Sequence, residues 1–244
     1  MDLGLAGKVF VLSGGSRGLG LATAKALHAE GAEVVIGSRH PTAAAEALGV
    51  VGVQVDLGDP ASAQALVDAA LDRHGRLDGA LVSVGGPPPG GALDLTDEQW
   101  TAAFGSVFLG AVRLCRAVVA ALPTEGGALA LVLSTSVKSP VAGLAASNGL
   151  RPGLGMLAKT MADELGPRGV RVNGLLPGRV ATDRLRELDG PDPEVAARNA
   201  ATIPLRRYGD PAEFGRVAAF LLSPAASYVT GAMVPVDGGV LRSL

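Results

Sequence analysis

The residues with the clearest chemical meaning are the glycines of the segment Ser13–Gly20, near the N-terminus. The segment follows a short apolar run and leads into Gly18–Ala29, where apolar residues recur at helical spacing. A tight turn requires Gly14, a pyrophosphate needs the bare backbone of Gly18, and close helix–strand packing requires Gly20. The helix N-terminus offers unpaired N–H groups to phosphate oxygens. The sequence therefore predicts a nucleotide-binding turn, with a purely structural glycine turn as the alternative.

Two arginines beside this turn bear on the choice of cofactor. Dinucleotide-binding turns are usually followed, about 20 residues further on, by an acid that holds the ribose hydroxyls. Here the second apolar run ends at Gly37, Ser38 and Arg39, without an acid. The guanidinium group of Arg39 suits a 2′-phosphate, and Arg17 adds a second positive charge. Together they favour NADP(H) over NAD(H), and two ordinary surface arginines are the alternative.

Short apolar runs alternate with helical patterns along the whole chain. Strands alternating with helices predict βαβ units and a parallel sheet with right-handed crossovers. No linker rich in serine, proline or charge divides the chain, so we expect residues 1–244 to form a single α/β domain. The runs predicted as strands are Val9–Leu12, Val34–Ile36, Val50–Val55, Ala80–Val84, Ala128–Leu133, Val170–Leu176 and Met233–Val236.

Helix-capping residues mark where several helices begin. Asp59 is predicted to cap a helix that has Pro60 at its first position. Thr96 and Gln99 form a capping-box pattern that opens a long helix running to about Leu122. The Pro/Gly-dense segment after the fourth strand, residues 85–91, is interpreted as a stiff rim of the site or as a plain turn.

Composition excludes several functional classes. Hydrophobic residues make up 48% of the 244 residues and charged residues 18%, which is enough apolar material for a folded core. The net charge is −2 and the chain has no basic block, so we expect no nucleic-acid partner. Mean hydropathy is +0.35, but the apolar runs are far shorter than the ~20 residues of a membrane helix. With no signal-peptide pattern and Cys115 as the single cysteine, we expect a soluble cytoplasmic protein.

Several further motifs occur in the order typical of one family. The turn resembles a Thr-Gly-x-x-x-Gly-x-Gly motif with Ser13 in place of threonine, and Asp56 stands where that family has an aspartate that contacts adenine. The stretch Leu165–Asn173 precedes a Pro-Gly-x-x-x-Thr motif at Pro177–Thr182, and Thr230–Gly239 matches a C-terminal signature. On these motifs the chain resembles the short-chain dehydrogenase/reductase family, in particular its 3-oxoacyl-ACP reductase-like branch.

The resemblance implies a Rossmann-like, doubly wound parallel sheet of about seven strands with helices on both faces. It also implies hydride transfer between NAD(P)(H) and a small carbonyl or alcohol substrate, and assembly into a homotetramer. The residues expected at the cofactor are Gly14, Ser16, Arg17, Gly18, Leu19, Gly20, Arg39, Asp56, Leu57, Gly85, Pro177, Gly178, Val180 and Thr182.

The chain departs from the family at the chemistry itself. The resemblance implies a tyrosine as acid/base, a lysine four residues later, a serine that steadies the substrate oxygen and an asparagine in a proton relay. The tyrosine and lysine positions hold Ser147 and Arg151, and the asparagine position holds Val107. We interpret Ser136 as the retained serine.

These replacements change what the site can do. An alkyl hydroxyl such as that of Ser147 is a far weaker acid than a phenol, whose pKa lies near 10. Arg151 can hold a ribose, an anionic substrate or an oxyanion, but it does not pass on a proton. Pro152 disfavours helical backbone at the residue before it, so we expect a displaced helix start here. Lys138, near Ser136, is a candidate replacement acid, with a solvated loop charge as the alternative.

Two functions follow from this pattern. The first is an NADP-linked oxidoreductase with an atypical site built from Ser136, Ser147, Arg151 and Lys138, with water as the proton source. The second is a catalytically inactive or regulatory NADP-binding protein that keeps the fold.

Overall fold

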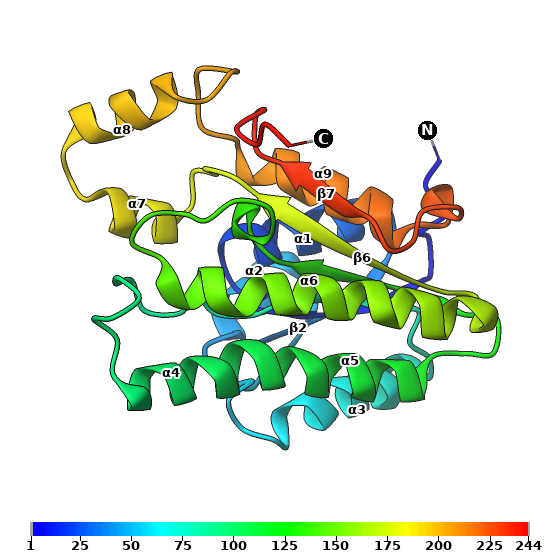
Figure 1. The fold of residues 1–244 in the computed structure, drawn as a ribbon. Helices are drawn as coiled ribbons and strands as arrows, with labels where there is room; N and C mark the ends of the chain where they lie inside the picture. Colours follow the sequence, from blue (N-terminus) through cyan, green and yellow to red (C-terminus); the bar gives the residue numbers. More distant parts are fainter. Residues whose placement is uncertain (1, 244) are drawn as a thin grey trace.

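A computed structural model describes residues 2–243. Seven strands form one parallel sheet in the order β3-β2-β1-β4-β5-β6-β7, with helices on both faces (Figure 1). The strands are β1 Val9–Ser13, β2 Glu33–Ser38, β3 Val51–Gln54, β4 Gly79–Ser83, β5 Gly127–Val132, β6 Val170–Pro177 and β7 Met233–Val236. The predicted doubly wound α/β fold and its seven strands are confirmed. The strand order reverses between β1 and β4, which opens a crevice at the carboxyl edge of the sheet.

The helices cover the sheet in two layers. Alternate residues of β1 show this division, since Val9 and Val11 face one core and Phe10 and Leu12 the other. Helices α3, α5 and α6 pack in the first core, and α1 and α9 pack in the second (Figure 1). The helices are α1 Gly18–Ala29, α2 Thr42–Leu48, α3 Ser62–His74, α4 Asp97–Ala103, α5 Gly110–Ala121, α6 Ala145–Leu165, α7 Asp183–Asp189, α8 Pro193–Ala201 and α9 Pro211–Leu222.

Two helix starts test the capping predictions. The capping box of Thr96 and Gln99 is confirmed, because each side chain accepts a hydrogen bond from the other's backbone N–H. The prediction for Asp59 is wrong: α3 begins only at Ser62. The carboxylate of Asp59 instead accepts the N–H of Ala61, which closes a turn ahead of the helix. An aspartate side chain can cap a helix or close a turn, and Asp59 closes a turn.

Helices α4 and α5 are joined by a π-helical segment, Phe104–Leu109, into one long helix. This stretch, Asp97–Ala121, is the one helix of the described residues that is long and apolar enough to cross a membrane. Its buried residues, among them Val107, Leu114 and Val118, belong to the core under the sheet. A core helix of this kind passes the same test of length and composition, so the stretch is weak support for a membrane span.

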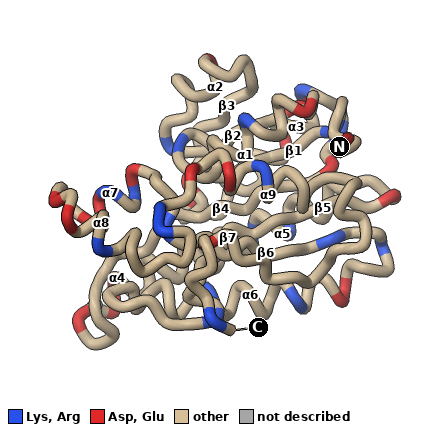
Figure 2. Tube along the Cα trace, turned by 90° about the horizontal axis from the view of Figure 1, so that it is seen from above, with Lys and Arg blue, Asp and Glu red and all other residues tan. Residues whose placement is uncertain are grey.

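Charged residues of both signs are interspersed along the described chain (Figure 2). In this view blue and red segments both occur on the loops and helices around the sheet. This distribution fits the net charge of −2.

Helix α6 corrects the expectation for Pro152. The helix starts at Ala145 and continues through Pro152, so Ser147 and Arg151 both lie on regular helix. Proline has no N–H and so withholds one hydrogen bond from the helix. Outside contacts hold the first turns in place: the side-chain amide of Asn148 accepts the N–H and donates to the carbonyl of Val141. Tertiary contacts here outweigh the local preference of the residue before a proline.

Three glycines of α6 contribute to the same packing. A Cβ at Gly149 would lie 3.3 Å from the ring of Trp100, and one at Gly153 would lie 3.1 Å from the ring of Phe108. A Cβ at Gly155 would lie 3.0 Å from Val137. These glycines therefore let α6 approach the long helix and the loop after β5 closely, which fixes where Ser147 and Arg151 stand.

The opposite, amino-terminal edge of the sheet is fastened by one carboxylate. Asp78 accepts hydrogen bonds from the N–H of Val9, from Arg76 at 2.7 and 2.9 Å, and from Lys8 at 3.1 Å. Burial alone would raise the pKa of Asp78, but the hydrogen bonds from Arg76, Val9 and Lys8 outweigh burial and lower it. The carboxylate thus joins the start of β1 to the segment that leads into β4.

We expect Asp78→Asn to lower the free energy of unfolding by about 1–3 kcal/mol near neutral pH, because charged hydrogen bonds are lost from a buried site. The pKa of Asp78 is lower in the folded state than in the unfolded state. The stabilisation is therefore fully present when the pH is above the unfolded-state pKa, and it is lost as the pH falls through the folded-state pKa. Urea denaturation should show the gap between wild type and variant narrowing towards about pH 3. The exposed Asp68→Asn on α3 is the control, and a gap that stays constant with pH would contradict the assignment.

Candidate active site

The predicted nucleotide-binding turn lies at the point where the strand order reverses. Gly14 and Gly18 both adopt positive φ, of 64° and 54°, which disfavours side chains. A Cβ at Gly20 would collide with the carbonyl oxygen of Gly14, so the turn folds back against the start of α1 only because Gly20 has no side chain. The first turn of α1 contains no acidic residue. Its N–H groups therefore face the crevice as an electropositive end.

The turn is held to its neighbours by hydrogen bonds. The hydroxyl of Ser13 donates to the carbonyl of Ser83 at 3.0 Å and accepts the Ser83 N–H at 2.9 Å, which joins the ends of β1 and β4. The N–H of Gly15 donates to the carbonyl of Gly37 at 3.2 Å, which joins the turn to the end of β2. Gly85 is exposed just beyond β4, at the same edge.

The residues predicted for the adenosine end follow β2 and β3. Arg39 is exposed two residues beyond the contact between Gly37 and the turn, and Arg17 is exposed inside the turn as the N-cap of α1. Asp56 is exposed after β3, and one of its carboxylate oxygens accepts the N–H of Gly58. Both arginines and the aspartate thus lie at the carboxyl edge of neighbouring strands, with their side chains open to solvent.

The loop after β6 closes the other side of the crevice. Gly178 lies against Asp237, where a Cβ would be 2.7 Å from the backbone. Val180 is buried, and Thr182 caps α7 by accepting the N–H of Leu185. The methyl group of Thr182 lies 3.4 Å from where a Cβ of Gly18 would be, so this loop packs directly on the glycine turn.

These features fit a dinucleotide. Gly14 and Gly20 let the turn fold tightly against Ser83 and the start of α1, the bare backbone at Gly18 allows a pyrophosphate to approach closely, and the end of α1 offers N–H donors to it. The loop with Pro177 and Gly178 borders the adjoining pocket, where a nicotinamide would sit. Ser16, Leu19 and Leu57 lie between exposed and buried at the same edge of the sheet.

A pocket of about 190 Å³ adjoins the crevice between α6, the loop after β5 and α7. Ser134, Ser147 and Arg151 lie on its wall, together with Gly86 and Pro87 of the predicted rim. Ser134 was not among the residues predicted from the sequence. It is the first hydroxyl after the end of β5, and this position was the signal that could have identified it.

Ser136, which was expected to contact the substrate oxygen, lies behind the wall of the pocket. It lies in the short 3₁₀ helix Thr135–Val137, is buried, and is not among the described residues that line the pocket. Its Oγ lies 3.3 Å from the Oγ of Ser147, so it contacts the pocket residue from behind. Its N–H donates to the hydroxyl of Ser134 at 3.0 Å. Ser136 therefore positions two hydroxyl groups of the wall.

Lys138, the candidate acid, and Val107, which stands at the family's asparagine position, both lie outside the pocket lining. Lys138 is exposed at the end of the same 3₁₀ helix and does not line the pocket among the described residues. Val107 is buried in the π-helical segment, where it belongs to the hydrophobic core. A role for Lys138 as proton donor stays a prediction.

Arg151 is the most unusual charge of the site. Its side chain is buried, and Nη1 donates to the carbonyls of Val132 and Leu133 at 2.7 and 2.9 Å. No carboxylate of the described residues pairs with it. Burial, followed by the nearby positive charge of Arg184, lowers the pKa of Arg151 to about 10. The guanidinium group therefore stays charged at neutral pH, without a counter-ion from the described chain.

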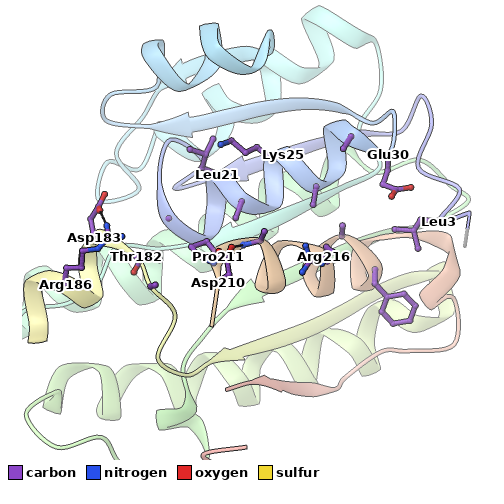
Figure 3. A pocket seen from close by; sticks show the side chains of 18 residues that line it. Leu3, Leu21, Lys25, Glu30, Thr182, Asp183, Arg186, Asp210, Pro211 and Arg216 are labelled. Atoms are coloured by element: carbon purple, nitrogen blue, oxygen red, sulfur yellow. Dashed lines mark hydrogen bonds and ion pairs between the residues drawn. The ribbon is translucent and has the colours of Figure 1, made fainter. Parts of the chain in front are cut away.

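A second, larger hollow of about 830 Å³ runs along α1 and α9 (Figure 3). Leu21 and Lys25 line it from α1, and Pro211 and Arg216 line it from α9. Thr182 borders both this hollow and the smaller pocket. None of the hydroxyl groups near Arg151 reaches the larger hollow, so the candidate chemistry belongs to the smaller pocket.

Comparison with known proteins agrees with this architecture. Residues 14–241 match the family model described as "Enoyl-(Acyl carrier protein) reductase". The human protein named dehydrogenase/reductase SDR family member 4 is 34% identical over 246 residues, which cover 96% of this chain and 88% of that protein. An L-rhamnose 1-dehydrogenase (NAD(P)(+)) of Azotobacter vinelandii is 33% identical over 251 residues, which cover 97% of this chain and 98% of that protein.

Solved structures give the same result. L-sorbose reductase from Gluconobacter frateurii, complexed with NADPH and L-sorbose, is 30% identical with a TM-score of 0.91, covering 100% of both chains. A short-chain oxidoreductase from Pseudomonas aeruginosa, described as containing an atypical catalytic center, is 31% identical with a TM-score of 0.91, again covering 100% of both chains. With its motifs, its strand order and these matches over almost its full length, the chain belongs to the short-chain dehydrogenase/reductase family.

Proposed function

We propose that this chain is an NADP(H)-dependent oxidoreductase that transfers hydride between the cofactor and a small carbonyl or alcohol. The observation that carries this proposal is the pocket beside the glycine turn, where two serine hydroxyls and the buried cation Arg151 converge. The relatives named above as a dehydrogenase and as a reductase complexed with NADPH support the same activity.

The wall residues can perform most of the work of a carbonyl reductase. A bound nicotinamide supplies the hydride. Because Ser134 accepts the N–H of Ser136, its own hydroxyl proton is free to point into the pocket. Ser134 and Ser147 then donate to the carbonyl oxygen, while the charge of Arg151 stabilises the negative charge that develops there. The proton comes from water, since neither hydroxyl is a useful acid near neutral pH.

A preference for NADP(H) is the finer part of the proposal. Arg39 and Arg17 both lie exposed beside the end of β2, where the ribose of the adenosine half is expected. No acid stands at the end of β2 to hold the ribose hydroxyls instead. A 2′-phosphate therefore meets positive charge at this edge.

We expect the protein to bind NADPH more tightly than NADH, and Arg39→Ala to remove this preference. The affinity for NADPH should fall on the order of 10-fold, the effect of losing one charge-assisted hydrogen bond. Calorimetric titration of both cofactors measures this. Arg73→Ala, an exposed arginine near the end of α3, is the control. Equal affinity of the wild type for the two cofactors, or no binding of either, would refute the assignment.

We expect weak reduction of ordinary ketones by the wild type, because general acid catalysis by a tuned group contributes about 10²–10⁴-fold. Since α6 is continuous through Ser147 and Arg151, the double variant Ser147→Tyr, Arg151→Lys should raise ketone reduction, followed by the loss of NADPH absorbance. The matched control is Ser147→Phe, Arg151→Lys, which adds the ring without the hydroxyl. A tyrosine variant no faster than this control, with NADPH binding intact, would show that the geometry is wrong.

If the wild type binds NADPH but reduces no carbonyl, the chain is the catalytically inactive or regulatory NADP-binding protein. Removing the hydroxyl of Ser136, which contacts the hydroxyl of Ser147, helps to decide between an active enzyme and an inactive NADP-binding protein. Ser136→Ala should lower any native activity and leave NADPH binding unchanged, because Ser136 lies behind the pocket wall.

We propose a homotetramer as the assembled form, with a cytoplasmic location that stays a prediction. Phe104 and Met156 are exposed apolar side chains, 42% and 71% accessible, on the long helix and on the neighbouring α6. Burial of such side chains between subunits would stabilise an assembly. Light scattering at micromolar concentration should give the mass of four chains, and Met156→Glu should lower this mass. A monomer mass for the wild type would refute the assembly.

A further inference from the structure

The charges around the small pocket are all of one sign. Of the described residues that line it, Arg151 and Arg184 are the charged ones, and no carboxylate is among them. The two arginines come from different elements, α6 and α7, so no single helix brings them together by its own periodicity. Two positive charges that line one pocket repel each other, and a bound anion would relieve this repulsion.

Arg151 has hydrogen-bonding capacity to spare. Only 7% of the residue is exposed, and the hydrogen bonds to Val132 and Leu133 both use Nη1. In the described chain, Nε2 of His74 is the one fully buried side-chain nitrogen or oxygen that lacks a hydrogen-bond partner. The N–H groups of Arg151 that have no partner are therefore not fully buried and can reach a ligand. The pocket that Arg151 lines is the space they reach.

Arg184 faces the same space from the opposite rim. Its Nη2 donates to the carbonyl of Pro87 at 3.0 Å, which holds the guanidinium group beside another residue of the pocket lining. A Cβ at Gly86 would lie 3.0 Å from its Nε. Its one acidic neighbour within ion-pair distance in the described chain is Glu187, at 3.8 Å and largely exposed, which neutralises it poorly.

We propose that Arg151 and Arg184 select a carbonyl substrate that carries a carboxylate, such as a small 2-oxo acid, in an assignment that rests on the proposed function. A carboxylate accepts two parallel N–H groups from a guanidinium fork. In a 2-oxo acid the carbonyl oxygen and the carboxylate sit on adjacent carbons, so Arg151 reaches both. The small volume, about 190 Å³, favours a short acid over a long acyl chain.

The reaction balances without a further co-reactant. Hydride from the reduced cofactor adds to the carbonyl carbon as the C=O π bond opens, and the oxygen takes a proton from water, which is released as hydroxide. The carboxylate is unchanged, and a 2-hydroxy acid and oxidised cofactor leave. Arg151 and Arg184 hold the carboxylate in place throughout, and the charge of Arg151 also lowers the energy of the alkoxide.

Binding of an unreactive analogue tests the pair without requiring turnover. Oxamate has the size of a small 2-oxo acid and carries a carboxylate, and oxamide is its neutral counterpart. We expect the protein loaded with NADPH to bind oxamate at least about 10-fold more tightly than oxamide, by calorimetry. Arg184→Met keeps the length of the side chain and removes its charge, so it should lower this preference by about 10-fold, while Arg151 retains part of the attraction.

The matched control is Arg186→Met, on the same helix. Arg186 pairs with Asp183 at 2.6 Å and does not line the small pocket. This variant should bind oxamate as the wild type does. Equal binding of oxamate and oxamide by the wild type, or an unchanged preference in Arg184→Met, would overturn the inference. If the wild type binds inorganic phosphate as tightly as oxamate, and Arg184→Met no longer binds phosphate, the site is a general anion site and the choice of a carboxylate is overturned.

The cofactor and anion measurements separate the two proposals. Failure of NADPH to bind the wild type counts against the proposed function, and oxamate titration of the cofactor-free protein then still tests the arginine pair. NADPH binding without any preference for oxamate counts against the anion site alone.

Discussion

The hydroxyl of Ser13 is the contact on which the geometry of the site most depends. It donates to the carbonyl of Ser83 and accepts its N–H, so it joins β1 and β4 where the strand order reverses. Strands on either side of this point continue in opposite directions across the sheet, and their connections leave the crevice open. A Cβ at Gly14 would lie 3.0 Å from the same Ser83 carbonyl, so a side chain there would strain the joint.

A second constraint positions the chemistry. Helix α6 carries Ser147 and Arg151 and lies close to the long helix because Gly149 and Gly153 leave room for Trp100 and Phe108. Ser136 then approaches Ser147 from the loop after β5. The cation of Arg151 is held by backbone carbonyls rather than by a carboxylate, which keeps its positive charge available to a ligand.

Much of the fold was predictable because its signals are local. The five central strands, β2, β1, β4, β5 and β6, are apolar runs that are largely buried on both faces, and the capping box at Thr96 depends on residues three apart. The site was less predictable. Of the three consecutive hydroxyl residues Ser134, Thr135 and Ser136, the family resemblance pointed to Ser136, but Ser134, the first hydroxyl after the end of β5, lines the pocket.

The least predictable features of the site depend on distant contacts. Arg184 lies 33 positions after Arg151 in a stretch with no distinctive pattern, so only the fold shows that both line one pocket. Pro152 was predicted to displace the start of α6, and the side chain of Asn148, among other contacts, keeps it in place. Local preference describes one residue and its neighbours, whereas these two outcomes depend on contacts between loops and helices.

The proline in α6 also affects how the site moves. Because Pro152 gives no N–H to the helix, the first turns of α6 receive less support from the rest of that helix. They are held instead by the loop before them: the N–H of Ala145 donates to the carbonyl of Gly90, and Gly90 donates to Gly143. We therefore expect the loop that contains Gly90 and the first turns of α6 to open together in local unfolding, which amide hydrogen exchange would detect as shared protection.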